Sequence, residues 1–476
     1  MKWRLINACP LVFMTSVSGA SLPAWRQSLR SAKAALLSAP AQGSKGCASG
    51  GRLALAVGNM AGDLDSLVSA LGAARLHGGA AVAAFPTAEL AMRRDAAALF
   101  ARYGVDARSE IVFLDELSDD VCDAWRGRLD VVLTDHNRLA DSLAAKLGDN
   151  VVEILDHHAD EGAHASAAAR DIDTSAGSCC TLVAERVVAC GDRDDDALLC
   201  MLLAAIAVDT RSFKLAKTSK RDALAVLKMV NVLSDGPPAL KYTTELSLEE
   251  LALAAARAAL PAAHALSAAA ATVADVGAAL VSSRSDVLDL GLADLLRLDY
   301  KQAAGGVLQV GVASTTRRMR DLVDVAGSVS AFVEAIEDLA AEKHADIVFI
   351  LGAKDDTDLC DGFALSKHKD LIYVVVPPAS ASADDARALK SFSQSLELYL
   401  ERVPAGLPPD LAANPLFAQQ RITERGFNAL FDDFNYNGQK SPASPLRATR
   451  ISKDVTRKTL MPTILHFCSK LAPLQP

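Results

Sequence analysis

The sequence lacks a C-x-x-C pair, an apolar run long enough to cross a membrane, and an excess of basic residues. Its nine cysteines are scattered mostly through apolar helical segments. A zinc ribbon and a thioredoxin-type motif are therefore excluded, and buried thiols in a reducing compartment are the simplest interpretation. The missing apolar run excludes a transmembrane helix. The net charge of −9 argues against a general nucleic-acid or membrane-surface binder.

Acidic residues are also missing from residues 1–62, although this segment carries several Lys and Arg residues. An Arg-rich, Ser-rich and acid-free N-terminus is typical of a mitochondrial transit peptide. The alternative is a first helix over Leu22–Leu37 followed by a flexible segment. A cytoplasmic location is the primary prediction and a mitochondrial one the alternative.

The chain has 476 residues, of which 51% are hydrophobic and 22% charged, so it can form two or three domains with large cores. Short Val/Leu/Ile strands alternate with Ala-rich helices, which predicts the α/β fold class. Parallel strands are expected at 53–57, 81–85, 111–114, 130–134 and 151–155. A second α/β unit is expected with strands at 307–312, 347–351 and 371–376.

The predicted organisation is an N-terminal helix and flexible segment over 1–50, a parallel-sheet domain over 51–235, a linker over 236–250 and a second α/β domain over 251–470. The linker prediction depends on the Ser, Gly and Pro residues of 234–242. An active-site cleft is expected between the two domains.

Three polar clusters follow predicted strands directly, and each is rich in carboxylate or imidazole groups. The clusters are Asn59, Asp63 and Asp65 within Gly58–Ser66, then Asp135-His136-Asn137, then Asp156-His157-His158. A further carboxylate, Asp209, ends a long apolar helix. The carboxyl ends of parallel strands meet at one edge of a sheet, so these side chains are expected to converge. Together they could hold two divalent cations, the usual tool for attack on a phosphoryl group.

Each cluster also has an ordinary structural explanation. The segment with Asp63 and Asp65 could be a solvated loop in which Asp65 or Ser66 caps a helix, and Asp135 could belong to a strand-end turn. Adjacent histidines at a strand end rarely serve packing, so His157 and His158 are harder to explain in this way. Basic residues such as Lys214 could bind phosphate or form a charged helix face.

The order of the clusters resembles the DHH phosphoesterase superfamily, which includes family II inorganic pyrophosphatases, eukaryotic exopolyphosphatases and the Prune proteins. The resemblance runs from about residue 50 to the C-terminus, and the second half is similar to the accessory domain DHHA2. Val455–Pro462 is similar to the Ser-Arg-Lys substrate-binding motif of this group. Thr456 replaces the serine, and Arg457 and Lys458 are retained.

The resemblance implies a role for each residue. Asp135 would bridge two cations, Asp63 would serve one of them, and Asp65, His157 and Asp209 would serve the other. His158, Arg457 and Lys458 would act on the substrate phosphate, and Asn59 and Lys214 are also assigned to substrate binding. Asp156 and His136 would lie behind the ligands, with Asp156 orienting a neighbouring imidazole.

Position 59 distinguishes branches of the superfamily. Family II pyrophosphatases have His at this position, whereas the exopolyphosphatase and Prune branches have Asn. Loss of an imidazole leaves a harder, oxygen-rich site, which favours Mg²⁺ over Mn²⁺ or Co²⁺. The segment Gly58–Ser66 looks most like the fungal exopolyphosphatases. The predicted function is hydrolysis of the terminal phosphate of inorganic polyphosphate by a water activated between two metals, in a monomer.

Two alternatives remain open. Within the same fold, the chain could be an inorganic pyrophosphatase or a Prune-type short-chain polyphosphatase or nucleotide phosphodiesterase. From another class, it could be an interaction protein that retains a site of this kind, and the intact clusters argue against that alternative.

Overall fold

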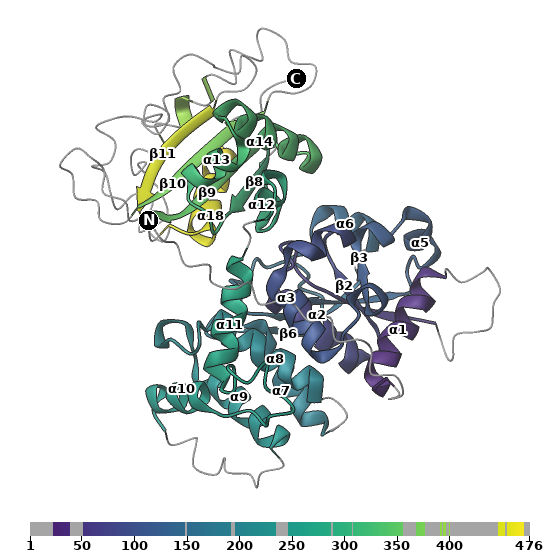
Figure 1. Cartoon of the computed structure of the whole chain (residues 1–476). Helices are drawn as coiled ribbons and strands as arrows, with labels where there is room; N and C mark the ends of the chain where they lie inside the picture. The colour runs from purple at the N-terminus through teal and green to yellow at the C-terminus, as the bar shows by residue number, and fades with distance from the viewer. Residues whose placement is uncertain are drawn as a thin grey trace, which may run out of the picture.

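The computed structural model describes residues 22–38, 51–147, 150–191, 196–234, 246–286, 289–306, 308–355, 368–376, 446–452 and 455–470, with a few positions between 391 and 399. These residues form two α/β domains, each with its own sheet (Figure 1). The predicted fold class is confirmed. A further prediction, that the Pro-, Asn- and Phe-rich stretch 403–437 is irregular, lies outside the described residues.

The first domain contains a six-stranded sheet in the order β3-β2-β1-β4-β5-β6, with every neighbouring pair parallel. The strands are β1 (Leu53–Val57), β2 (Ala80–Ala83), β3 (Ile111–Phe113), β4 (Leu129–Thr134), β5 (Val151–Asp156) and β6 (Ala169–Ile172). The chain moves outward from β1 to β3 and then returns to place β4 on the other side of β1. The resulting switch point between β1 and β4 is where open α/β sheets bind ligands.

Helices cover both faces of this sheet. One face carries α2 (Leu64–His77), α3 (Arg94–Tyr103), α7 (Cys179–Cys190), α8 (Asp196–Asp209), α9 (Lys220–Leu233), α10 (Leu248–Arg257) and α11 (Val273–Ser285). The other carries α5 (Asp119–Ala124) and α6 (Asp141–Leu147). Shorter turns are η1 (Thr87–Met92), α4 (Ala107–Glu110), η2 (Leu114–Glu116) and η3 (Leu215–Lys217). Alternate residues of β1 point to opposite cores, Ala56 to the first and Leu55 to the second.

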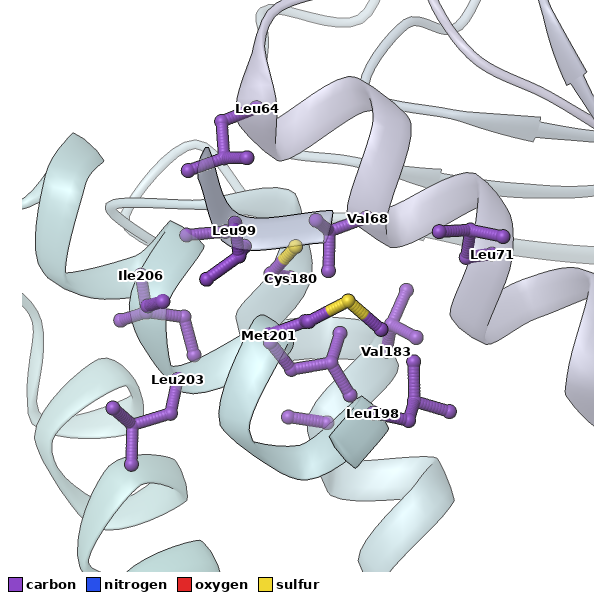
Figure 2. Packing of buried hydrophobic residues seen from close by; sticks show 14 of the residues in the cluster. Leu64, Val68, Leu71, Leu99, Cys180, Val183, Leu198, Met201, Leu203 and Ile206 are labelled. Atoms are coloured by element: carbon purple, nitrogen blue, oxygen red, sulfur yellow. The ribbon is translucent and has the colours of Figure 1, made fainter. Parts of the chain in front are cut away.

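The packing of α2 against α7 and α8 fixes the start of α2 close to the end of α8. Figure 2 shows Val68 and Leu71 of α2 beside Cys180 and Val183 of α7, with Met201 of α8 nearby. All five side chains are buried. Because α2 begins next to Asp63 and α8 ends at Asp209, this core holds two of the predicted ligands in one region.

The helix α1 (Ala24–Leu37) packs beside β2 and β3 and confirms the helix expected over Leu22–Leu37. Its basic side chains are partners of the buried Glu110 and the half-buried Glu116. Arg26 Nε donates to Glu110, which is 0% exposed, at 2.9 Å, and Lys33 Nζ donates to Glu116 at 2.7 Å. Within α1, basic residues of the kind that suggested a transit peptide therefore form ion pairs with the first domain. Among the helices of the described residues, none has both the length and the apolar character that a bilayer crossing needs.

The second domain contains a five-stranded sheet in the order β11-β10-β9-β8-β7. The strands are β7 (Tyr300–Gly305), β8 (Leu308–Ser314), β9 (Ile347–Asp355), β10 (His368–Val375) and β11 (Leu446–Ser452). Its helices are α12 (Leu292–Arg297), α13 (Met319–Ala326) and α14 (Val329–Lys343) on one face and α18 (Arg457–Lys470) on the other. β7 and β8 pair antiparallel across the turn at Gly305 and Gly306.

We propose that the boundary between the two domains lies later than the predicted linker at 236–250. Leu251 in α10 and Val276 in α11 are buried in the same core as α2 and α8. The second core begins with residues around α12. Most of the predicted linker lies outside the described residues. We propose a boundary near residues 286–291, because hydrophobic cores define domains more directly than loop composition does.

Candidate functional site

Asp135 lies at the centre of the polar residues at the switch point. It follows β4 directly and has a φ of +64°, a left-handed conformation that costs a non-glycine residue roughly 1–2 kcal/mol. Its buried Oδ1 makes no hydrogen bond of good geometry, although His157 Nε2 lies 3.2 Å and His158 Nδ1 3.6 Å away. Native proteins rarely leave a buried carboxylate oxygen unsatisfied. A cation bound between Asp135 and His157 would satisfy this oxygen.

His157 is oriented as a metal ligand would be. Its Nδ1 donates to the carbonyl oxygen of Ala176 at 3.2 Å, which leaves Nε2 pointing into the cluster. One ligand atom from each of Asp65, His157 and Asp209 lies within 4.8 Å of the others, and the same holds for Asp135, His157 and His158. The structure thus brings together five of the residues predicted from the three clusters and α8.

The start of α7 fixes Asp65. Its carboxylate accepts hydrogen bonds from the Ser178 hydroxyl at 2.6 Å, from the Cys179 N–H at 2.7 Å and from the Cys180 N–H at 2.8 Å. The Asp65 carboxylate thus satisfies the free N–H groups at the start of α7, and these donors stabilise its negative charge. Sequence reasoning missed their role, although Ser178 before an apolar helix is a recognisable cap.

Asp156 holds the imidazole of His158 and the amide of Asn137. Its Oδ1 accepts from His158 Nδ1 at 2.8 Å, and its Oδ2 accepts from Asn137 Nδ2 at 2.6 Å. Burial would raise the pKa of Asp156, but these donors lower it to about 2. His136 turns away, with Nδ1 at 2.9 Å from the Thr134 carbonyl oxygen, and burial lowers the pKa of this imidazole to about 4.

Asn59 lies beneath Asp135, although a substrate-binding role was expected for it. Its Oδ1 accepts from the N–H groups of Ala61 at 2.8 Å and Gly62 at 3.1 Å, so its Nδ2 faces Asp135 and donates to Oδ2. The side chain is buried and its polar atoms are used within the loop and on Asp135. Asp63 caps α2 by accepting from the Ser66 N–H at 3.1 Å, so the cap lies two residues earlier than the nearest predicted one.

The cluster carries more negative charge than its own donors balance. Burial, together with the charges of Asp63 and Asp65, raises the pKa of Asp135 to about 6. Burial and the same two carboxylates raise the pKa of Asp209 well above its ordinary value. Burial would lower the pKa of His157, but the surrounding carboxylates raise it to about 10. Bound cations would relieve this repulsion between buried carboxylates.

Basic side chains from the later half of the chain act on this cluster. Burial would raise the pKa of Asp63, but Lys301 on β7, Arg284 on α11 and Arg457 on α18 lower it. Arg457 Nη1 donates to the Asp299 carbonyl oxygen at 2.8 Å and to the Asp299 carboxylate. Arg284 donates from Nε to Asp95 at 2.6 Å, and its buried Nη2 has no hydrogen-bond partner. Sequence reasoning missed Lys301 and Arg284, because isolated basic residues carry no distinctive pattern.

Other predicted basic residues are less closely tied to the cluster. Lys214 is exposed at the start of η3. Arg221, in the same basic run, forms ion pairs with Asp171, Asp173 and Glu185, so its role is structural. Lys458 lies in the first turn of α18, and the position of its side chain is outside the described part.

Two protein-family models match the chain in the order of its two domains. The model described as the DHH family, N-terminal domain, matches residues 54–208, and the model described as the DHHA2 domain matches residues 278–467. The chain belongs to the DHH phosphoesterase superfamily. In this DHH protein, the clusters from Asn59 to His158 lie inside the first match, and Asp209 follows its last residue. Lys301, Arg284 and Arg457 lie inside the second match.

The solved structures to which this chain is similar are remote. A putative family II inorganic pyrophosphatase from Methanococcus jannaschii is 15% identical, with a TM-score of 0.45, and the match covers 87% of this chain and 98% of that one. An exopolyphosphatase-related protein from Bacteroides fragilis is 10% identical, with a TM-score of 0.35, and the match covers 78% of this chain and 96% of that one. The assignment of this DHH protein to its superfamily rests on the two family models.

Proposed function

We propose that this DHH protein is a metal-dependent phosphoanhydride hydrolase that removes the terminal phosphate of inorganic polyphosphate. The observation that carries the proposal is the unsatisfied Oδ1 of Asp135, 3.2 Å from His157 Nε2 and surrounded by further carboxylates. A buried group of this kind is costly without a cation, so its retention in the fold points to a metal-dependent reaction.

Two divalent cations fit the donors that are present. Asp135 would bridge them, Asp63 would contribute to one, and Asp65, His157 and Asp209 would hold the other. Cations held in this way would supply a water made nucleophilic at neutral pH and would neutralise charge on the phosphoryl oxygens. The mixture of carboxylates with few imidazoles favours Mg²⁺, with Mn²⁺ or Co²⁺ as substitutes.

The remaining residues bind and orient the substrate. His158 is held through Nδ1 by Asp156 at 2.8 Å, which leaves Nε2 for a phosphoryl oxygen. Arg457, fixed by Asp299, and Lys301 bring positive charge to the same cluster from the second domain. Donors fixed before the reaction stabilise charge that develops on the phosphoryl oxygens. We also propose that Lys458 and Lys214 bind phosphate.

The preference for polyphosphate over pyrophosphate rests on Asn59. Its amide is used on Asp135 and the loop N–H groups, so this position adds no imidazole to the metal site. The resemblance links Asn at this position to the exopolyphosphatase and Prune branches. A chain end with several phosphates also suits a site to which Arg284, Lys301 and Arg457 all contribute positive charge.

A substrate panel tests the proposal. Phosphate release would be measured from pyrophosphate, tripolyphosphate and long-chain polyphosphate, and formation of the nucleoside monophosphate from a cyclic nucleotide, each with Mg²⁺ and with Mn²⁺. We expect the highest kcat/KM on polyphosphate with Mg²⁺. A strong preference for pyrophosphate would replace the proposal with a pyrophosphatase. Metal-independent activity, or no hydrolysis of any substrate, would contradict it.

A further inference from the structure

Arg93 lies against the loop that carries Asp63. It precedes α3 and is only 4% exposed. Its Nε donates to the Gly62 carbonyl oxygen at 2.7 Å, and its Nη2 donates to the Ala61 carbonyl oxygen at 2.8 Å. Its guanidinium carbon lies 3.5 Å from the centroid of the Phe85 ring, within cation–π range. A buried cation is therefore bonded to two successive carbonyl groups of the loop.

The loop before Asp63 has little freedom to move away from Arg93. Gly62 has a φ of +55°, and a Cβ at this position would lie 2.1 Å from the Phe85 ring and 3.0 Å from Arg93 Nε. The N–H groups of Ala61 and Gly62 are bound by Asn59 Oδ1, while their carbonyl groups are bound by Arg93. The Ala61–Gly62 peptide group is thus held at both its carbonyl and its N–H, immediately before Asp63.

Arg93 is also linked to the second domain. Its Nη1 donates to the backbone carbonyl oxygen of Glu89 at 2.8 Å, and its Nη2 lies 3.5 Å from Glu89 Oε2. The other carboxylate oxygen of Glu89 lies 3.6 Å from Nζ of Lys343, the last residue of α14, whose Nζ also pairs with Glu342 at 3.0 Å. A chain of polar contacts therefore runs from the second domain through Glu89 and Arg93 to the Asp63 loop.

We propose that Arg93 is a positioning residue for the cation that Asp63 would hold, and that Glu89 and Lys343 couple this loop to the second domain. The inference rests on the proposed metal site but not on the choice of substrate. Loss of a partner behind metal ligands typically costs 10–100-fold in metal affinity or activity. Because Arg93 acts on the loop before Asp63, its effect is expected on one cation of the pair rather than on both.

Mn²⁺ binding to the full chain tests the positioning role. Bound Mn²⁺ would be counted by electron paramagnetic resonance, with affinities from calorimetry, for the parent, Arg93→Gln and Arg93→Lys. We expect Arg93→Gln to weaken one of two Mn²⁺ ions at least tenfold while the other is retained. Arg93→Lys, which can still donate to a loop carbonyl group, should recover part of the loss. Equal weakening of both ions, or no weakening, would overturn the inference.

Arg94→Gln is the matched control, because it removes the same charge one residue away, where the guanidinium pairs with Asp289. It should leave both Mn²⁺ affinities within about twofold of the parent, since exposed pairs contribute little. If Arg94→Gln and Arg93→Gln behave alike, local charge explains the effect and the positioning role is wrong.

Lys343→Met tests the coupling to the second domain, and this side chain is partly exposed, so the variant should fold. We expect it to weaken the same Mn²⁺ ion as Arg93→Gln, by roughly two- to fivefold, as for loss of one partly exposed ion pair. Parent affinity in Lys343→Met would overturn the coupling. If the parent binds two Mn²⁺ ions with this order of variants but hydrolyses no phosphoanhydride, the proposed function fails while the positioning role stands.

Discussion

Asn59 Nδ2 donates to Asp135 Oδ2, while Asn59 Oδ1 accepts from the N–H groups of Ala61 and Gly62. The two backbone donors fix the orientation of the amide, which the side chain alone would leave ambiguous. Asn59 therefore holds the carboxylate of Asp135 and the loop before Asp63 together. Asn59 thus acts on the cluster from behind the Asp135 carboxylate.

Asn59→His tests the importance of this position for substrate preference. The substitution would add a nitrogen ligand and remove the amide oxygen that accepts from two backbone N–H groups. We therefore expect a higher activity on pyrophosphate relative to polyphosphate and a shift in metal preference from Mg²⁺ to Mn²⁺. Initial rates on both substrates with each metal measure the change. Asn59→Ala is the control, because it removes the amide without adding an imidazole and should lower both activities. An unchanged ratio in Asn59→His would contradict the argument.

The metal-free protein should lose stability as pH rises through about 6. The pKa of Asp135 is raised to about 6, chiefly by burial, and that of Asp209 is raised in the same direction. A carboxyl group with a folded pKa above its unfolded value stabilises the fold when protonated, and this contribution disappears above the folded pKa. The lowered pKa of Asp156, about 2, acts only at lower pH.

Cations should therefore stabilise the protein more at high pH. Protons compete with cations for the same oxygen atoms, so we expect Mn²⁺ to raise Tm by several degrees more at about pH 8 than at about pH 5. Thermal unfolding with Mn²⁺ and with a chelator at both pH values measures this difference. An equal or larger shift at the lower pH would contradict the assignment of these carboxylates as ligands.

Arg284→Gln should separate substrate binding from metal binding. Its Nη2 is buried without a hydrogen-bond partner, and its charge acts on Asp63 and Asp209. We expect KM for polyphosphate to rise roughly tenfold, about 1.4 kcal/mol. Mn²⁺ affinity should stay equal or increase, because a repulsive charge is removed. Arg257→Gln on α10 is the control. An unchanged KM in Arg284→Gln would exclude a substrate role.

Arg26→Met should destabilise the first domain strongly. Its side chain is 9% exposed and pairs with Glu110, which is 0% exposed, so the variant weakens the neutralisation of a buried charge. Loss of a buried partner typically costs about 3–5 kcal/mol. Arg30→Met removes a partner of the same Glu110 with a 36% exposed side chain, and should cost less than about 1 kcal/mol. Denaturant unfolding compares the two, and equal losses would contradict the account of α1.

The first sheet was predictable because its strands are short, apolar and followed by polar residues. The predicted strand at 53–57 matches β1, and the strand at 151–155 differs from β5 by one residue. β6 was missed because Ala169–Ile172 is half-buried and has two adjacent charged residues, Arg170 and Asp171, at its centre. β11 was missed because Leu446–Ser452 contains two arginines and no continuous apolar run.

The convergence of the polar clusters was predictable because parallel strands deliver their carboxyl ends to one edge. The groups that support them were not, because their role depends on distant contacts. Arg93 looks like an ordinary residue in Arg93-Arg94-Asp95, yet it binds the Asp63 loop. Ser178 lies more than a hundred residues from Asp65, to which it donates. Lys301 and Arg284 influence Asp63 only once the two halves of the chain have folded.

The most direct test of the central claim is phosphate release from long-chain polyphosphate with Mg²⁺ by Asp135→Ala, with bound Mn²⁺ counted in parallel. Asp130→Ala is the control on the same strand, because Asp130 pairs with Arg52 at the surface. We expect Asp135→Ala to lose Mn²⁺ binding and to reduce turnover at least 1000-fold, on the order of 4 kcal/mol, with Asp130→Ala close to the parent. Near-normal turnover by Asp135→Ala would contradict the proposed metal centre.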